Sequence, residues 1–362
     1  MGFCRNSGRA PRRTHASSHD PERASFWCAL RRVFEPGPLH LGGRYHRRHH
    51  SSGRGSRLRR GSLGLGSPEG KGSLVNEIVL LLVYAAPVAF AALGETVVQK
   101  SGVINIGLEG AMLGAAYVAL IATQATGSPL VGLLAGTVVG LLAVLLFGVF
   151  TVLLAADQVV VGTAINLLGL GATGALFRNR FGQSGSLLSV PRLPQIFVGI
   201  DLGLLLLLAA VPVIWFLLNR TGWGLALRSA GEYPKAVEAS GFRVEAVRMQ
   251  ALAVGGVLAG LAGAYLTVGI TGSFTENVTG GRGFVAIAVV TFGRWKPVGV
   301  LLAALLIGLA ESLQFVLQAR GVAVPYQLLL ALPYVVALLV LVIAGRGTAA
   351  PASLGVPYRR EG

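Results

Sequence analysis

The stretch Lys100–Gly110, with the sequence KSGVINIGLEG, places an amide and a carboxylate at the start of an apolar segment. A carboxylate at membrane depth is costly to bury and usually serves a function. Asn105 and Glu109 are four residues apart, which predicts that they share one helix face. Two interpretations stay open. The stretch is a broken helix that flanks a path across a membrane, or an interfacial helix start whose positive end Glu109 complements.

Two further polar side chains interrupt an apolar run closer to the C-terminus. Glu311 and Gln314 lie one helical turn apart within residues 297–317. Polar groups at such positions line a path or form a hydrogen bond between helices. Phe284 belongs to a separate, shorter apolar run. We take Asn105, Glu109, Phe284, Glu311 and Gln314 as the candidate residues of a translocation path.

Residues 222–241 combine helix signals with a polar composition. Pro234 suits the first position of a helix, acidic Glu232 precedes it, and Gly241 suits the position just past the end. Ala236 and Val237 would supply the apolar contacts of this helix. A helix of about two turns is unstable alone, so it must dock on another surface. That surface is either a partner protein or the membrane interface.

Other chemistry is largely excluded. Cys4, Cys28 and all six histidines lie within residues 1–73, so the rest of the chain offers no thiol and no imidazole. This excludes a zinc site, a thiol nucleophile and a histidine base there. Residues 64–72 resemble a phosphate-binding loop only superficially, because Gly72 stands where Ser or Thr would bind magnesium. We expect no catalytic group, no metal and no cofactor in this chain.

The elements that must position these residues are membrane helices. The chain is 53% hydrophobic and 13% charged, about half the charged share of a soluble domain. Apolar runs long enough to cross a bilayer occur at residues 76–94, 103–123, 129–154, 158–177, 199–218, 246–269, 297–317 and 326–345. The sequence therefore predicts an all-α, polytopic helical bundle.

A shorter apolar run, Gly283–Gly293, is too short to cross the hydrocarbon core as a helix. It predicts a half-helix completed by extended backbone, or a re-entrant segment, and such interruptions usually line a cavity. Counting these gives about eight to nine membrane segments. The Lys and Arg residues between 219 and 245 place that loop in the cytoplasm, with five crossings before it.

Residues 1–73 form a basic tail that holds 15 Lys and Arg residues against 4 Asp and Glu residues. The tail has no apolar periodicity and is expected to be disordered. The parity of the crossings would put this positive tail outside the cell, against the usual tendency. We therefore favour a misplaced translation start, with the working protein beginning near Leu74, over an arm that binds nucleic acid. Residues 74–347 then form the membrane domain, and residues 348–362 a short cytoplasmic tail.

Three motifs resemble one family. Residues 100–110 resemble the ERSGVVNIGLEG pattern of permeases in the simple-sugar and nucleoside branch of bacterial ABC importers, which is related to the branched-chain amino acid and ribose permeases. Residues 222–241 resemble the family's coupling segment, GLALRAVGENPxAAxxAGI, with Tyr233 where Asn is common. Residues 284–297 resemble its short-helix region. The resemblance covers Ile78 to Gly347.

The resemblance implies a multi-pass permease subunit of the bacterial plasma membrane that carries a small neutral polar solute, a nucleoside first and a simple sugar next. Glu232, Pro234, Ala236, Val237 and Gly241 would form a coupling helix that docks on a cytoplasmic ATPase, where ATP and magnesium bind. A second, different permease subunit and an extracytoplasmic binding lipoprotein would complete the assembly. No nucleic acid is expected.

Two alternatives remain. An ion-coupled secondary transporter would need charged relays in several spans, and only Glu109 and Glu311 qualify. An ABC permease for branched-chain amino acids shares the same architecture. An intramembrane enzyme finds little support, because no nucleophile is paired with a base.

Overall fold

The structure is a computed structural model that describes residues 72–182, 189–197, 199–319, 325–344 and 350–358. The chain divides into two units, Met1–Leu65 and Gly66–Gly362, and all described residues belong to the second unit. The predicted basic tail and the loop-like stretch at residues 64–71 lie outside the described residues. Residues 345–349 lie outside the described residues as well.

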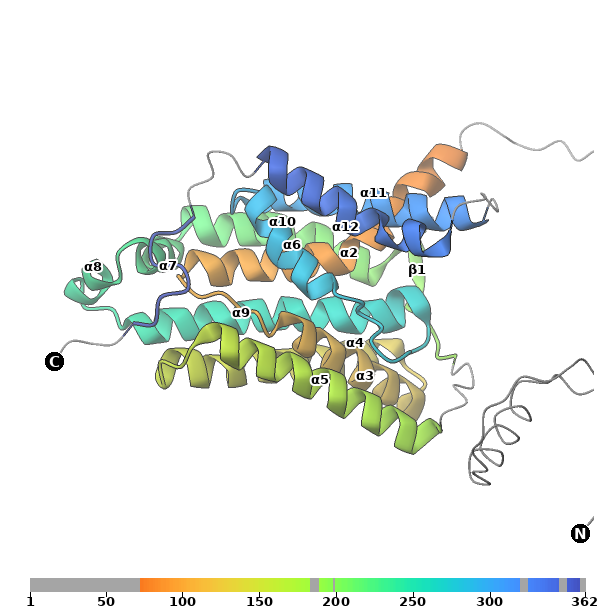
Figure 1. The fold of residues 1–362 in the computed structure, drawn as a ribbon, viewed down its shortest axis with the longest axis horizontal. Helices are drawn as coiled ribbons and strands as arrows, with labels where there is room; N and C mark the ends of the chain where they lie inside the picture. The colour runs from red at the N-terminus through yellow and green to blue at the C-terminus, as the bar shows by residue number, and fades with distance from the viewer. Residues whose placement is uncertain (1–71, 183–188, 198, 320–324, 345–349, 359–362) are drawn as a thin grey trace, which may run out of the picture. The chain divides into compact units, whose positions relative to one another are not determined.

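The described residues fold almost entirely into helices (Figure 1). The α-helices are α2 (Gly72–Lys100), α3 (Leu108–Thr126), α4 (Pro129–Gly148), α5 (Gln158–Phe181), α6 (Leu202–Arg220), α7 (Gly222–Glu232), α8 (Pro234–Ala239), α9 (Val244–Tyr265), α10 (Arg282–Phe292), α11 (Pro297–Ala319) and α12 (Tyr326–Ala344). Two π-helical turns, η1 (Val149–Leu153) and η2 (Leu266–Thr271), extend α4 and α9. Two short antiparallel strands, β1 (Gln195–Phe197) and β2 (Ile200–Asp201), pair Gln195 with Asp201.

Seven of the described helices are long and apolar enough to cross a membrane. Their spans are Ile78–Lys100, Leu108–Thr126, Pro129–Leu153, Gln158–Phe181, Leu202–Arg220, Val244–Thr271 and Pro297–Gln318. Two shorter apolar segments, Arg282–Phe292 and Gln327–Val340, belong to α10 and α12. The prediction of an all-α polytopic bundle with a half-helix is confirmed.

The bundle has two distinct ends. The α8 end holds α7, α8 and the C-terminal segment, whereas the β1–β2 hairpin lies at the opposite end (Figure 1). Helix α2 runs between them, since Val79 contacts Gly199 beside the hairpin and Lys100 contacts Gly231 of α7. Five membrane-length helices, α2 to α6, precede α7. This order agrees with the predicted number of crossings before the loop at 219–245.

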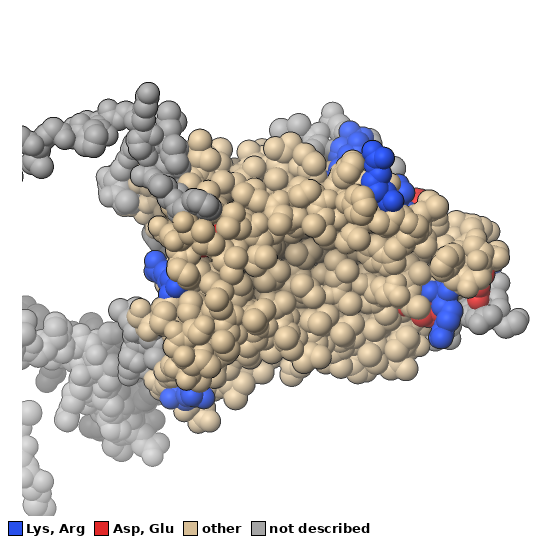
Figure 2. All heavy atoms as spheres, turned by 180° about the vertical axis from the view of Figure 1, so that it is seen from behind, with Lys and Arg blue, Asp and Glu red and all other residues tan. Residues whose placement is uncertain are grey.

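The face in Figure 2 carries its exposed charges at the two ends. A broad belt without charged side chains separates blue groups at both ends, and the red groups lie mainly at the α8 end. Leu134, Leu142 and Leu167 are more than half exposed, although they lie on membrane-length helices. An apolar belt of this kind matches the hydrocarbon core of a bilayer, which is about 30 Å thick.

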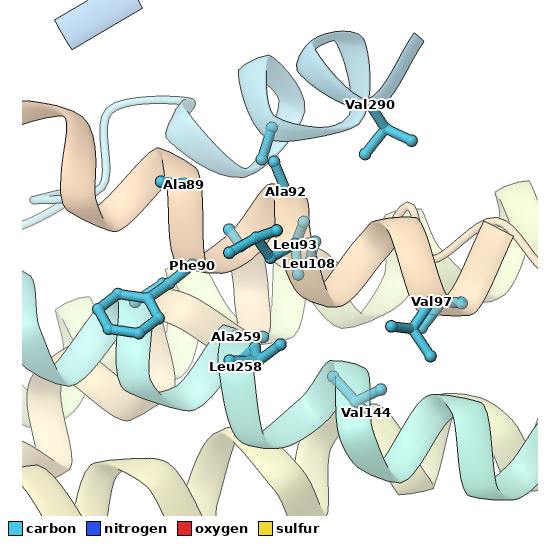
Figure 3. Packing of buried hydrophobic residues seen from close by; sticks show 14 of the residues in the cluster. Ala89, Phe90, Ala92, Leu93, Val97, Leu108, Val144, Leu258, Ala259 and Val290 are labelled. Carbon is cyan, nitrogen blue, oxygen red and sulfur yellow. The ribbon is translucent and has the colours of Figure 1, made fainter. Parts of the chain in front are cut away.

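The core lies between α2 and α9. In Figure 3, Phe90 and Leu93 of α2 lie on the side of α9 that carries Leu258 and Ala259, and all four are buried. Small residues let the backbones of neighbouring helices approach. Gly260 of α9 is one such residue, because a methyl group on it would lie 2.5 Å from Thr137 O of α4.

Candidate functional site

The first motif forms an unwound segment, Ser101–Gly107, between α2 and α3. The prediction that Asn105 and Glu109 share a helix face is wrong, because α3 begins at Leu108. The side chains of neighbouring helices bind the backbone of this segment. Glu95 Oε1 accepts a hydrogen bond from the Asn105 N–H at 3.0 Å, and Gln158 Oε1 accepts one from the Ile104 N–H at 2.8 Å. Such partners allow non-helical backbone at membrane depth, where every polar group must be satisfied.

Asn166 of α5 completes the support of the unwound segment. Its Nδ2 donates to Ile106 O at 2.8 Å, and its Oδ1 accepts from the Gly110 N–H at 2.8 Å. Three side chains, from α2 and α5, therefore hold the break in place. Because the contacts are built from fixed side chains of α2 and α5, the break is a feature of the fold and not a frayed helix end.

Glu109 caps the start of the half-helix α10. Its Oε1 accepts hydrogen bonds from Thr279 Oγ1 and from the Gly281 N–H at 2.7 Å, and its Oε2 accepts one from the Gly283 N–H at 2.7 Å. A carboxylate at this position satisfies the first N–H groups of a helix and complements its positive end. One interpretation held that Glu109 complements the start of its own helix. Glu109 does lie in the first turn of α3, but its carboxylate binds the start of a different helix, α10.

The backbones of α3 and α10 touch at this cap. A methyl group on Gly283 would lie 2.7 Å from the backbone nitrogen and Cα of Glu109. Any side chain here would push the two helices apart. Glycine at position 283 is therefore what lets the carboxylate reach the α10 N–H groups.

Next to the cap, Arg282 of α10 forms a two-point ion pair with Glu311 of α11. The Nη2–Oε2 and Nε–Oε1 distances are both 3.2 Å. Arg282 Nη1 also donates to Val278 O and Thr279 O in the loop before α10. The guanidinium thus ties the start of the half-helix to α11. A paired, hydrogen-bonded arginine is the form in which such a charge persists inside a membrane.

This pair borders a recess of about 360 Å³ between α10, α11 and α12. Gln314, Asn277 and Tyr334 add polar groups to its lining, and Tyr334 Oη donates to Gly280 O. Apolar side chains supply the remainder of the lining, including those of Val285, Ile307, Phe315 and Leu330. A mixed lining with a few placed polar groups is typical of a small-molecule site.

The structure brings together some of the five predicted path residues. Glu311 and Gln314 line the recess, and Glu109 binds the loop that forms one side of it. Asn105 is buried beside Glu95, and Phe284 is 50% exposed on α10; neither lines the recess. Their assignment to a translocation path stays a prediction.

Sequence reasoning missed two groups of functional candidates. Arg282 directly precedes the short apolar run Gly283–Gly293, which is too short to cross the hydrocarbon core as a helix. The length of this run therefore indicated that Arg282 carries its charge at about the middle of the membrane. Glu95 also escaped notice, although it is buried inside α2. It accepts a hydrogen bond from Gln99 Nε2 at 3.0 Å, and Gln99 Oε1 accepts one from Trp295 Nε1 at 2.8 Å. These polar residues sit in apolar surroundings, which was the available signal.

The second motif forms α7 and α8 at the α8 end. Helix α8 starts at Pro234, as predicted, and Gly241 follows it with φ +85°, a conformation that favours glycine. Val237 is buried against the body, whereas Ala236 is exposed. Ala236 lines a shallow groove between the two helices together with Leu225 and Phe242, which are both more than half exposed. Glu232 accepts a hydrogen bond from the Ala352 N–H.

Within the part of the chain that the structure describes, no group of three or more His, Cys, Asp or Glu side chains could hold a metal ion. The geometry defines a polytopic helical membrane protein with a capped half-helix, a recess of mixed polar and apolar lining and a short helical pair at one end. The family of permease components of branched-chain amino acid transport systems matches residues 77–345, and the chain belongs to this family.

Curated relatives are similar over most of this length. The guanosine ABC transporter permease protein NupQ of Bacillus subtilis is 35% identical over 301 residues, which cover 76% of this chain and 94% of NupQ. The nucleoside ABC transporter permease protein NupC of Lactococcus lactis is 33% identical, covering 77% and 95%. A putative glucose ABC transporter permease of Haloferax volcanii is 32% identical, covering 66% and 77%. No solved structure matches.

The family and the seven membrane-length helices establish the class of the protein. It is a multi-pass plasma-membrane transport component of an ABC system, and it works with the other components of such a system.

Proposed function

We propose that this chain forms the translocation path for a small neutral polar solute, a nucleoside first and a simple sugar next, in an ATP-driven importer. The observation that carries the proposal is the recess beside the capped half-helix. Its arginine is paired with Glu311, and the positive start of α10 is paired with Glu109. The described polar groups of the recess thus offer hydrogen bonds without an unpaired charge.

A charge-balanced recess favours a neutral solute over an ion. An anion would need the guanidinium of Arg282, which already binds Glu311 at two points. A cation would need the carboxylate of Glu109 or Glu311, and both accept hydrogen bonds from the protein. Gln314 and Asn277 can donate and accept hydrogen bonds with hydroxyl groups or a nucleobase. Relatives named for guanosine, nucleosides and glucose support this class of solute.

The energy comes from a separate subunit in this proposal. Helices α7 and α8 present an exposed apolar groove on an element too short to be stable alone. We assign this end to the cytoplasm and the groove to a partner ATPase that binds ATP and magnesium. Glu232, Pro234, Ala236, Val237 and Gly241 form or flank this docking element.

Two further partners follow from the same proposal. A second, different permease subunit completes the path, and an extracytoplasmic lipoprotein delivers the solute. Helix α5 fits a surface that faces lipid or another subunit, because only 17% of its span is buried inside this chain. Movement of the ATPases would switch the path between the two sides by favouring one conformation over the other.

Uptake in cells tests the solute class. A strain that lacks this chain, with and without a plasmid copy, is given radiolabelled guanosine, glucose or leucine. We expect the plasmid to restore uptake of guanosine or of glucose, and an excess of the same solute without label to compete with it. Restoration of leucine uptake alone would contradict the proposal and favour the branched-chain amino acid alternative.

A further inference from the structure

Residues 350–358 form a C-terminal strap across the α8 end. The Ser353 N–H donates to Gly231 O of α7 at 2.8 Å, and the Gly355 N–H donates to Gly102 O at 3.0 Å. The strap therefore binds α7 and the unwound segment at the same time. Figure 1 shows it as the dark blue chain beside α7.

The strap is also tied beyond these two bonds. Tyr358 Oη donates to Glu238 Oε2 of α8, which fixes the strap to the short helix. Arg248 of α9 donates from Nη1 to Val356 O at 3.2 Å and from Nε to Ser101 O at 3.2 Å. Leu354 and Tyr358 pack against the hydrophobic core. One arginine thus joins α9, the strap and the start of the unwound segment.

These groups meet where two glycine backbones touch. Gly102 has φ +92°, and a methyl group on it would lie 2.9 Å from Arg248 Nη2 and 3.3 Å from Gly231 Cα. A methyl group on Gly231 would lie 2.3 Å from Lys100 O. The contact leaves no slack between the end of α7 and the end of α2. Close-packed contacts of this kind transmit displacement instead of absorbing it.

The unwound segment leads from this contact to the recess. It runs from Ser101 to Gly107, and Glu109 follows in the first turn of α3. Glu109 holds the start of α10, and Arg282 at that start holds Glu311. A displacement of Gly102 would therefore be transmitted along the chain to the Glu109 cap of α10 and to the Arg282–Glu311 pair.

We propose that the C-terminal strap couples α8 to the unwound segment, with Tyr358 and Arg248 as positioning residues for transport. The inference rests on the proposed function, because the partner that displaces α8 is the ATPase. In this account the strap makes α8, α7 and Gly102 move as one unit. Without it, α8 can move while residues 101–107 stay in place.

The strap is separate from the docking groove. The groove is lined by residues of α7, α8 and the turn after α8, including Leu225, Ala236 and Phe242. Tyr358 Oη donates to Glu238, and Tyr358 does not line the groove. Removing that hydroxyl should leave ATPase docking intact and affect only the transfer of motion.

The test uses the complete transporter, purified with its ATPase and second permease and reconstituted in vesicles. Tyr358→Phe and a truncation that ends at Ala350 are compared with the wild type, and Tyr117→Phe on α3 is the matched loss of a hydroxyl elsewhere. Radiolabelled guanosine or glucose, whichever the wild type carries, and ATP hydrolysis are measured together. We expect both strap variants to lower the solute carried per ATP by about fivefold or more, the usual lower range of coupling between sites.

ATP hydrolysis and the amount of bound ATPase should stay close to the wild type in these variants. Loss of the ATPase from the Tyr358→Phe complex would overturn the inference, since the strap would then serve assembly. An unchanged ratio of solute to ATP in both variants would overturn it as well. If the wild-type chain carries no solute or binds no ATPase, the proposed function fails instead, so the two failures are distinguishable.

A double-mutant cycle and hydrogen exchange test whether the bond between Tyr358 and Glu238 itself transmits the motion. Glu238→Ala combined with Tyr358→Phe should lower the ratio no further than either change alone, because each change removes the same hydrogen bond. Trapping the wild type with ATP and vanadate should change amide exchange in residues 101–109, and Tyr358→Phe should abolish that change. Equal changes in the two proteins would contradict a role for the strap.

Discussion

At the scale of single residues, the carboxylate of Glu109 is the central feature of the site. It is buried and receives three hydrogen bonds from the segment Thr279–Gly283, which lies about 170 residues further along the chain. The sequence showed that this carboxylate was costly to bury and offered a helix start as its partner. It could not show which helix, because the contact is non-local.

Glu109→Gln should destabilise the protein and reduce transport. The amide keeps one acceptor oxygen but turns an N–H₂ group toward donors of α10. Leaving buried donors unsatisfied costs about 1–3 kcal/mol. Thermal unfolding in lipid nanodiscs and solute uptake measure the two effects. Glu276→Gln, in an exposed pair with Arg178, is the control and should change neither. An unfolding midpoint for Glu109→Gln equal to that of the wild type would refute the capping role.

Arg282 and Glu311 should behave as one unit. Either Arg282→Gln or Glu311→Gln leaves a largely buried charge without its partner, which typically costs about 3–5 kcal/mol. The double variant should be less destabilised than the sum of the singles, because no charge stays unpaired. Thermal unfolding of the four proteins gives the interaction energy. Strict additivity would show that the two side chains act independently.

At the scale of elements, apolar runs predicted which segments are helices but not where each begins. The run at 103–123 becomes a helix only from Leu108. Residues 103–107 are as apolar as the helix that follows, yet Glu95, Gln158 and Asn166 bind their backbone. Apolar composition therefore indicates burial in the membrane, whereas helicity depends on which polar partners lie nearby.

The contact between α3 and α10 gives a prediction at this scale. Gly283→Ala places a methyl group 2.7 Å from the Glu109 backbone, so the half-helix must move away from its cap. We expect a lower unfolding temperature and loss of uptake. Gly171→Ala in α5 is the matched control, since a methyl group there meets nothing within 4 Å. Wild-type stability in both variants would mean that the two helices do not approach this closely.

The groove between α7 and α8 gives a second prediction at the scale of elements. Leu225 is 61% exposed, so Leu225→Asp should leave the fold intact and weaken ATPase binding by about tenfold or more, as for a central interface residue. Co-purification of the ATPase at increasing salt measures the loss. Arg243→Gln, also exposed at this end but outside the groove, should behave as the wild type. If ATPase recovery with Leu225→Asp equals that of the wild type, the groove is not the docking surface.

At the scale of the whole molecule, hydropathy and charge predicted the class, the approximate number of crossings and their parity. The family match over residues 77–345 confirms the transport class that the motifs resembled. The strap was not foreseen, because residues 348–362 carry little apolar periodicity and their contacts lie far away in the sequence. The sequence therefore predicted only a short cytoplasmic tail at residues 348–362, because the backbone partners of such a segment cannot be inferred from its composition.

The central claim is that this chain provides a path for a neutral solute while another subunit supplies the energy. Vesicles that contain the complete transporter are loaded with ATP on the α8 side, and entry of radiolabelled guanosine is followed with vanadate or with ionophores that collapse ion gradients. We predict uptake that requires ATP, stops with vanadate and ignores the ionophores. Uptake that persists in vanadate and disappears with the ion gradient would contradict the account and identify a secondary transporter.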